Sequence, residues 1–370
     1  MAEHVDAQLA RRQRGYGRGR RMQIEQDAVE FLSGVRAGET IGSPIAMLVR
    51  NRDWKNWQEV MDPAPRPEDP ARKRAVTRVR PGHADLTGML KYDRADARDI
   101  LERASARETT ARVAVGAVCR RTLAEFGVCI GSHVAELGDI VARRPDPFPK
   151  DINAAADLSS VRTLDAEAER RMVERIDRAK ADGNTLGGIC EVVADGVCVG
   201  LGSHTAWDRR LDARIGRAMM SIPAVKGVEL GMGFAAARAM GSEVHDEMDP
   251  APDRVLAGGV RRRTNRAGGL EGGMTTGEPV VVRVAMKPIS TLMKPLATVD
   301  VATGDAAAAS VERSDVTAVP AMGVIAEAML AIVLTEALLE KFGGDSLAET
   351  RRNYDAFVSQ LNDRLVDRSR

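Results

Sequence analysis

The longest apolar run of the chain, residues 318–339, most constrains what this sequence can fold into. It contains two carboxylates, Glu327 and Glu336, and Pro320 stands near its start. A run of this length could cross a membrane, but buried charges are costly in lipid, and proline suits the first turn of a helix. The run therefore predicts a buried helix over residues 320–341, ended by the glycine pair that follows it.

Shorter segments alternate between strand and helix patterns. Residues 187–202 are typical of a hairpin turning at an Asp-Gly pair, residues 278–288 of a strand, and residues 211–220 of a helix. A helical pattern also begins at Ala97. Its apolar face comprises Val115, Val118, Cys119, Thr122, Leu123 and Phe126. The mixture lacks a strict βαβ rhythm, so we expect an α+β fold with antiparallel sheet.

Composition excludes several classes of protein. The 370 residues include 54 basic and 53 acidic side chains, and this balance is unlike the cationic excess of a dedicated nucleic-acid binder. The first thirteen residues contain acids and no apolar core, so we expect no secretory signal. The four cysteines stand singly without CxxC spacing, which predicts reduced thiols in the cytoplasm and no metal site. We expect neither a nucleic-acid nor a membrane partner.

An arginine-glycine block lies close to the N-terminus. The stretch RRQRGYGRGRRM, residues 11–22, has six arginines among three glycines. Glycine allows close approach of the backbone to a ligand, and guanidinium groups offer paired donors to phosphate or carboxylate oxygens. The block therefore predicts a site for a small, multiply charged anion.

Further polar blocks follow along the chain. They are RPGHAD at 80–85, RASARET at 103–109, TNRAGGLEGGMTTG at 264–277, KPIST at 287–291 and RSD at 313–315. Any one of them is typical of a solvated loop, but their number in one chain favours a binding site. His83 follows Arg80, whose cation disfavours a charged imidazole, so His83 is a candidate general acid or base. Capping of the loop is the structural alternative for His83.

In this order and over nearly the whole chain, the blocks resemble chorismate synthase. The resemblance implies a β-α-β sandwich with helices packed between antiparallel sheets, one domain over residues 1–370, and a cytoplasmic homotetramer. It implies a 1,4-anti elimination of phosphate from 5-enolpyruvylshikimate 3-phosphate to give chorismate. It also implies a need for reduced FMN without net oxidation, with NADPH or an external flavin reductase as the source of reduction.

The resemblance also assigns residues. It gives catalytic roles to His83, as a proton donor toward the flavin, and to Asp315, as the carboxylate that helps to remove the ring proton. Four arginines match positions that bind substrate or NADP, namely Arg12, Arg18, Arg21 and Arg80. The positions that match FMN contacts are Arg103, Ala104, Ser105, Pro223, Ala224, Gly272, Lys287, Pro288, Ile289, Ser290, Thr291 and Arg313.

The chain departs from the family pattern at three places. Family members carry a strand and a GESHG segment ahead of the RRQ block, with a second catalytic histidine that is not in the printed sequence. We expect either a start assigned at an internal methionine or an impaired copy, because loss of a positioned proton donor typically lowers the rate by about 10² to 10⁴. Met232 stands where an acid is usual, and Pro223 where a polar residue is common.

Two other functions compete with this interpretation. The segment GMGFAA at 231–236 resembles a dinucleotide fingerprint, which favours an NAD(P)-dependent oxidoreductase. However, a second strand ending in a lone acid does not follow it. The arginine-glycine block also resembles RNA-binding tracts, although aromatic residues make up only 3% of the chain and leave few stacking platforms.

Overall fold

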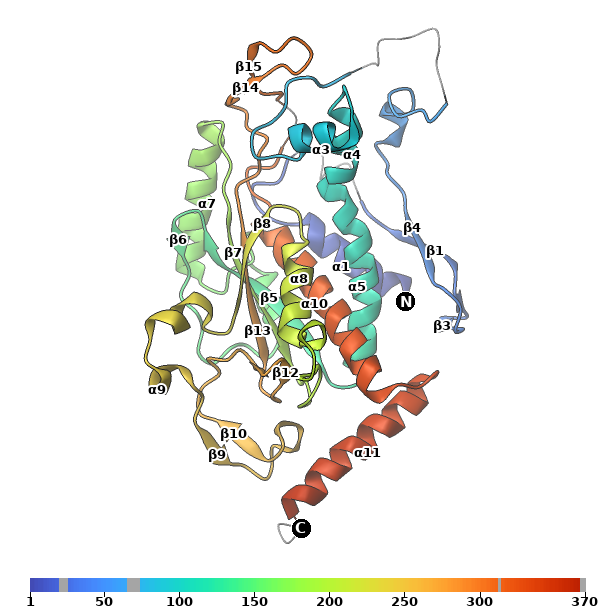
Figure 1. The fold of residues 1–370 in the computed structure, drawn as a ribbon, viewed down its shortest axis with the longest axis vertical. Coiled ribbons are helices and arrows are strands. Elements are labelled where there is room, and N and C mark those ends of the chain that lie inside the picture. The colour runs from blue at the N-terminus through green and yellow to red at the C-terminus, as the bar shows by residue number, and fades with distance from the viewer. Residues whose placement is uncertain (20–25, 65–73, 312–313, 367–370) are drawn as a thin grey trace.

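The computed structural model describes residues 1–19, 26–64, 74–311 and 314–366. Helix α10, Val319–Phe342, runs through the middle of the molecule (Figure 1). It is long and apolar enough to span a membrane, yet most of it is buried between strands and other helices, as in the core helix of a soluble protein. The buried helix predicted at 320–341 is therefore confirmed, and Gly343, with φ 60°, ends it.

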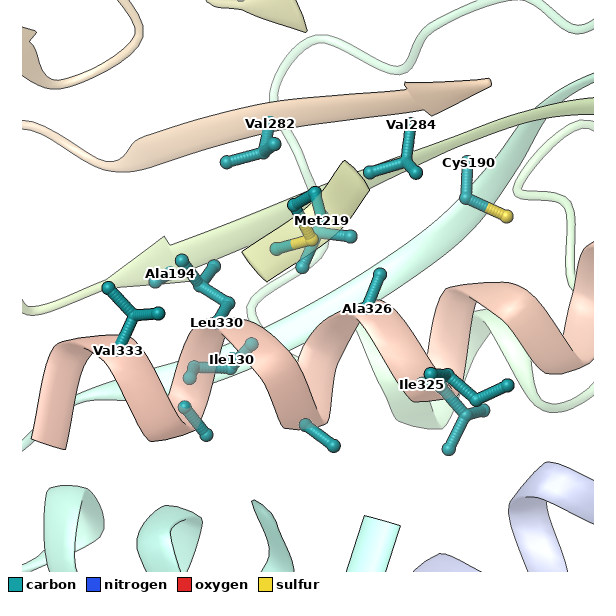
Figure 2. Close-up of a cluster of buried hydrophobic side chains, with 14 of the residues drawn as sticks. Ile130, Cys190, Ala194, Met219, Val282, Val284, Ile325, Ala326, Leu330 and Val333 are labelled. Carbon is teal, nitrogen blue, oxygen red and sulfur yellow. The ribbon is translucent and has the colours of Figure 1, made fainter. Parts of the chain in front are cut away.

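One face of α10 packs against a five-stranded antiparallel sheet in the order β6-β5-β7-β13-β8. The strands are β5 Cys129–Leu137, β6 Ile140–Val141, β7 Gly188–Asp195, β8 Val225–Leu230 and β13 Val280–Met286. Figure 2 shows Ala326, Leu330 and Val333 of α10 directed toward the side chains of these strands. Alternating strand residues such as Val282 and Val284 are fully buried here, because side chains on a strand point to opposite faces in turn.

Three more helices complete the central layer, namely α1 Ala2–Gln13, α5 Thr109–Ala124 and α8 Leu211–Met220. Beyond α1 and α5 lies a second, two-stranded antiparallel sheet of β1 Val29–Ser33 and β4 Ala46–Val49. Helices thus lie between antiparallel sheets, with the larger sheet on the left and β1 and β4 on the right of Figure 1. This confirms the expected α+β sandwich.

The remaining elements surround this sandwich. The other helices are α3 Asp85–Tyr92, α4 Arg98–Ala104, α6 Ile152–Ala156, α7 Ala166–Ala181, α9 Gly241–Val244 and α11 Leu347–Val366. Short strand pairs are β2 Val35–Arg36 with β3 Glu39–Thr40, β9 Met248–Pro250 with β10 Val260–Arg262, β11 Leu270–Glu271 with β12 Met274–Thr275, and β14 Ala297–Val299 with β15 Ala306–Ala308.

Local predictions succeeded where one periodic pattern dominated. The helix at 211–220 and the strand within 278–288 are confirmed. The hairpin at 187–202 is wrong in its second half, because after Asp195 the chain leaves the sheet and Gly200 N donates to Thr275 O at 2.9 Å. The face predicted for α5 is also partly wrong. Val115 is exposed, and small residues such as Ala114 and Ala117 are buried instead.

Small residues determine how closely α5 approaches α10. A Cβ placed on Gly116 would lie 2.6 Å from the Cα and 2.8 Å from the carbonyl oxygen of Ala328. These are backbone atoms, so a side chain at this point would push the two helices apart. The crossing therefore depends on glycine for space rather than for backbone conformation.

A buried ion cluster joins α10 to three other parts of the chain. Glu327 is 1% exposed and accepts hydrogen bonds from Arg11 at 2.8 and 3.0 Å, and from Arg120 at 2.7 Å. Arg162 Nη2 lies 3.3 Å from it, and Ser132 donates to it at 2.6 Å. Burial alone would raise the pKa of Glu327, but the three arginines lower it to about 2.

We expect Gly116→Ala to lower the free energy of unfolding by about 1–3 kcal/mol, because overpacking displaces the α5 and α10 backbones. Gly216→Ala in α8 is the matched control, since a Cβ on Gly216 would meet nothing within 4 Å. That change should stabilise by about 0.5–1 kcal/mol through helix propensity. Urea denaturation measures both, and a Gly116→Ala variant as stable as the parent would contradict this account of the crossing.

We expect Glu327→Gln to lower the free energy of unfolding by about 3–5 kcal/mol, because three buried arginines lose the carboxylate that they share and only Arg11 and Arg162 keep another, Asp157. The folded-state pKa of about 2 lies below the usual 4.5, so the Glu327 contribution is present above pH 4.5 and is lost as the pH falls towards 2. The matched control is Glu336→Gln on the same helix, with a side chain 63% exposed. Denaturant titrations between pH 7 and pH 3 should show a steeper acid loss in the parent than in Glu327→Gln.

Candidate active site

Polar blocks from distant parts of the sequence meet at one end of the large sheet, where β13 ends and β8 begins. Lys287 N donates to Ala224 O at 3.0 Å, and Lys287 Nζ donates to Gly82 O at 2.9 Å. The Ser290 hydroxyl accepts from Lys287 Nζ at 2.8 Å and donates to Gly82 O at 2.9 Å. The RPGHAD and KPIST blocks, about 200 residues apart, therefore form one surface.

Arg80 is the centre of this surface. Its guanidinium is buried and donates to Asp85 through Nε at 2.9 Å and to the Thr291 hydroxyl through Nη1 at 2.8 Å. Asp85 also accepts the backbone N–H of Arg80 at 3.1 Å. These hydrogen bonds fix the conformation of the Arg80 side chain. Its Nη2 lies 3.1 Å from His83 Nδ1.

His83 is oriented by the same carboxylate. Its Nδ1 lies 2.5 Å from Asp85 Oδ1, and a carboxylate can only accept, so Nδ1 carries the proton of that contact. Nε2 has only a long contact, 3.5 Å, with Arg80 Nη2, and the side chain is 23% exposed. Burial would raise the pKa of Asp85, but hydrogen bonds from His83 and Arg80 hold it well below its usual value. Asp85 is therefore a permanent anion at neutral pH.

Asp315 lies in a second cluster beside the first. Its Oδ1 accepts the backbone N–H of Gly19 at 2.6 Å, and its Oδ2 lies 3.2 Å from Arg18 Nε. The two clusters adjoin through the segment before β7. Thr185 donates its hydroxyl to Ile289 O at 2.7 Å, and Leu186 N donates to Val316 O at 2.8 Å.

Arg12 is directed inward rather than toward solvent. It is 4% exposed, and its Nη2 donates to Asp27 at 2.8 Å and to Thr110 at 2.7 Å. Asp27 also pairs with Arg107 Nη1 at 2.7 Å. The Nε of Arg12 is buried and has no hydrogen-bond partner in the part of the chain that the structure describes. Arg12 thus joins α1 to the 103–109 block, and its direct contact with substrate stays a prediction.

The predicted flavin contacts fall into two groups. Ala224, with φ 68°, Pro223 and residues 287–291 adjoin the His83 cluster, whereas Arg103 is exposed in the last turn of α4. Ser105 caps the short helix that follows, accepting from Arg107 N at 3.2 Å. Ala104 ends α4 just before it.

Gly272 is not brought to this cluster within the chain. It lies in the β11–β12 turn, beside Gly273, whose carbonyl accepts from Leu211 N at the start of α8. Pro223 follows the other end of α8, and the length of β13 corresponds to about 20 Å. Arg21 and Arg313 lie outside the described residues, so their predicted roles stay predictions.

The residues present fit a phosphate-bearing cofactor. Lys287 donates to two neutral acceptors, Gly82 O and the Ser290 hydroxyl, and the Thr291 hydroxyl lies at the neighbouring Arg80. Ammonium and hydroxyl donors next to an uncompensated positive charge are the groups that bind phosphate. No carboxylate is paired with Lys287 among the described residues, so the donor set is open to an anion.

Sequence reasoning missed two carboxylates that organise the site. Asp85 stands within the quoted RPGHAD block, and its place two residues after His83 was the available signal. Asp27 carried no signal, because its partners Arg12 and Arg107 are 15 and 80 residues away. Only the tertiary structure brings the carboxyl group of Asp27 next to these two arginines.

The fold is an α+β sandwich, and the site gathers the guanidinium, ammonium and hydroxyl groups that suit an anionic ligand. A family model described as chorismate synthase matches residues 1–339. A chorismate synthase of Symbiobacterium thermophilum is 57% identical over 361 residues, which is 96% of this chain and 91% of that protein. One from Mycobacterium avium is 56% identical, covering 99% and 91%. A crystal structure of chorismate synthase superposes with a TM-score of 0.77 at 42% identity, covering 98% and 90%.

The chain belongs to the chorismate synthase family. The expected lyase function is confirmed, and the oxidoreductase alternative is not favoured. The structure explains why the GMGFAA segment misled. It follows β8, an edge strand of an antiparallel sheet, and forms a 3₁₀ helix over Gly233–Arg238. A dinucleotide site of the Rossmann kind needs a parallel βαβ unit instead.

We expect Asp85→Asn to destabilise the site, because Arg80 and His83 lose their shared anion. Since the folded-state pKa of Asp85 is lowered, its contribution is present above about pH 4 and is lost as the pH falls further. Thermal unfolding at pH 7 should show a loss of about 2 kcal/mol or more. Asp93→Asn, at the exposed end of α3, is the control and should change little. Equal stability of the two variants would show that the Asp85 pairing is not structural.

Proposed function

We propose that the surface formed by Arg80, His83 and Lys287 is where this chain carries out the family reaction, loss of phosphate from 5-enolpyruvylshikimate 3-phosphate to give chorismate. The observation that supports this most is the meeting of blocks about 200 residues apart through the hydrogen bonds to Gly82 O. A core has no need of so many charged and hydroxyl groups at one sheet end.

Cations at this surface bind and orient the anionic substrate. Arg80 is held rigid by Asp85 and Thr291, so little conformational entropy is lost when it meets an anion. Arg18, beside Asp315, supplies a second guanidinium. Arg12 supports the surface from behind through Asp27. Such pre-set donors also stabilise charge that develops on a leaving phosphate.

His83 and Asp315 handle protons. The contact with Asp85 fixes the His83 tautomer, so Nε2 is the ring atom that accepts or gives a proton at the open side. Asp315 is oriented by Gly19 N and Arg18, and its carboxylate is the base that helps to remove the ring proton. The carboxylate geometry is thus set by the arginine-glycine block.

Reduced FMN is the proposed cofactor. Residues 103–105, Pro223, Ala224 and residues 287–291 would hold it, with Lys287 and the neighbouring hydroxyls toward its phosphate. The chemistry that reduced FMN supplies when bound is a reversible source of an electron, so that the reaction has no net oxidation. The open donor set around Lys287 supports this assignment.

The proposal also covers the oligomeric state and the source of electrons for the flavin. We infer a cytoplasmic homotetramer, in which Gly272 would contribute to a flavin site of another copy, because it is remote from Lys287 within its own chain. NADPH, directly or through an external flavin reductase, would provide the reduction.

We expect His83→Gln to lower turnover by about 10² or more, since a positioned acid or base contributes about 10² to 10⁴. Affinities for FMN and for 5-enolpyruvylshikimate 3-phosphate should change less than about fivefold. The control is His204→Gln, because His204 is exposed. The measurement is the rate of chorismate formation under anaerobic conditions with reduced FMN. The rate of each variant is divided by the rate of the parent chain. Unchanged turnover of His83→Gln would remove it from the catalytic residues.

A further inference from the structure

The first residues of β8 are irregular. Gly227 lies opposite Ala285 and Val225 opposite Met286, so Lys226 is an extra residue in the pairing. This is a β-bulge, and Ala224 just before it has a left-handed φ of 68°. Such irregularities cost free energy and are frequent next to active sites, where a bulge re-aims a side chain.

Lys226 and Lys287 stand beside each other at this end of the sheet. Val225 is 5% exposed, and Met286 packs against the same core on the helix side. A bulge interrupts the alternation of side chains, and Lys226 is exposed, so it lies outside that core. Lys287 directly follows Met286, and its N–H donates to Ala224 O at 3.0 Å, two residues before Lys226.

No described carboxylate balances this pair of ammonium groups. Lys287 Nζ donates to a carbonyl and a hydroxyl, both neutral. Lys226 is exposed, and its ammonium has no hydrogen bond or ion pair within the described ranges. Burial, and then the charge of Lys226, lower the pKa of Lys287. Two like charges near each other are unfavourable unless an anion completes the arrangement.

We propose that Lys226 is an anion-binding residue of the active site and, together with Lys287, clamps the phosphate group of a ligand. The inference rests on the proposed function, because it takes this sheet end as the place of reaction. Two ligands carry a phosphate, FMN and 5-enolpyruvylshikimate 3-phosphate, and the lysine pair suits either. An ammonium on a flexible stem acts as a point charge toward phosphate and needs no fixed planar geometry.

The test compares Lys226→Met, Lys226→Arg and the control Lys150→Met. Lys150 is exposed and precedes α6, which packs on β5, two strands away from β13. Binding of FMN, of riboflavin, which lacks the phosphate, and of 5-enolpyruvylshikimate 3-phosphate is measured for each variant. We expect Lys226→Met to weaken one phosphate-bearing ligand roughly tenfold, with Lys226→Arg within about threefold of the parent.

The pattern of losses identifies the ligand. Weaker FMN with unchanged riboflavin assigns Lys226 to the flavin phosphate, and a weaker phosphorylated substrate with unchanged FMN assigns it to the substrate. If Lys226→Met binds both like the parent, the inference is overturned. The variant Lys287→Met distinguishes failure of the Lys226 inference from failure of the proposed function. If only Lys287→Met weakens ligand binding, the role of Lys226 is overturned and the proposed reaction site stands. If neither variant weakens binding, the proposed reaction site is overturned as well.

Discussion

The ion cluster around Glu327 is the interaction on which the rest of the structure depends. A carboxylate in the middle of the apolar helix α10 is tolerable only because Arg11, Arg120 and Arg162 surround it. These arginines come from α1, α5 and the loop before α7, so a single buried anion sets how three segments approach the core helix. Arg11 and Arg162 also share Asp157, at 2.7 Å each, so loss of Glu327 would leave three buried cations with one carboxylate between them.

The same cluster positions the candidate site. Arg11 is held at Glu327, and Arg12, the next residue, turns to Asp27 and the start of α5. The glycine loop that follows passes closely over Pro320, since a Cβ on Gly15 would lie 3.1 Å from Pro320 Cβ. Gly19 then reaches Asp315. The arginine-glycine block thus divides into an inner part that anchors the fold and an outer part that adjoins the site.

Sequence patterns predicted the parts of the fold that depend on local periodicity. The helix at 211–220 and the strand within 278–288 have uniform patterns and were found correctly. The predicted face of α5 was partly wrong because apolar periodicity favours large side chains, whereas α10 approaches through Gly116. At the site, His83 was visible in its motif, but Asp27 was not, since its partners come from distant segments.

By itself, the sequence determined the family, the residue types of the site and the buried character of α10, because motifs and hydrophobic runs are contiguous. Only the tertiary structure decided which arginines face inward, which carboxylate orients His83, and that a bulge at Lys226 adjoins the end of β13. Those outcomes depend on distances between segments far apart in the chain. A buried charge must find its partner in space, and spacing along the sequence does not reveal that partner.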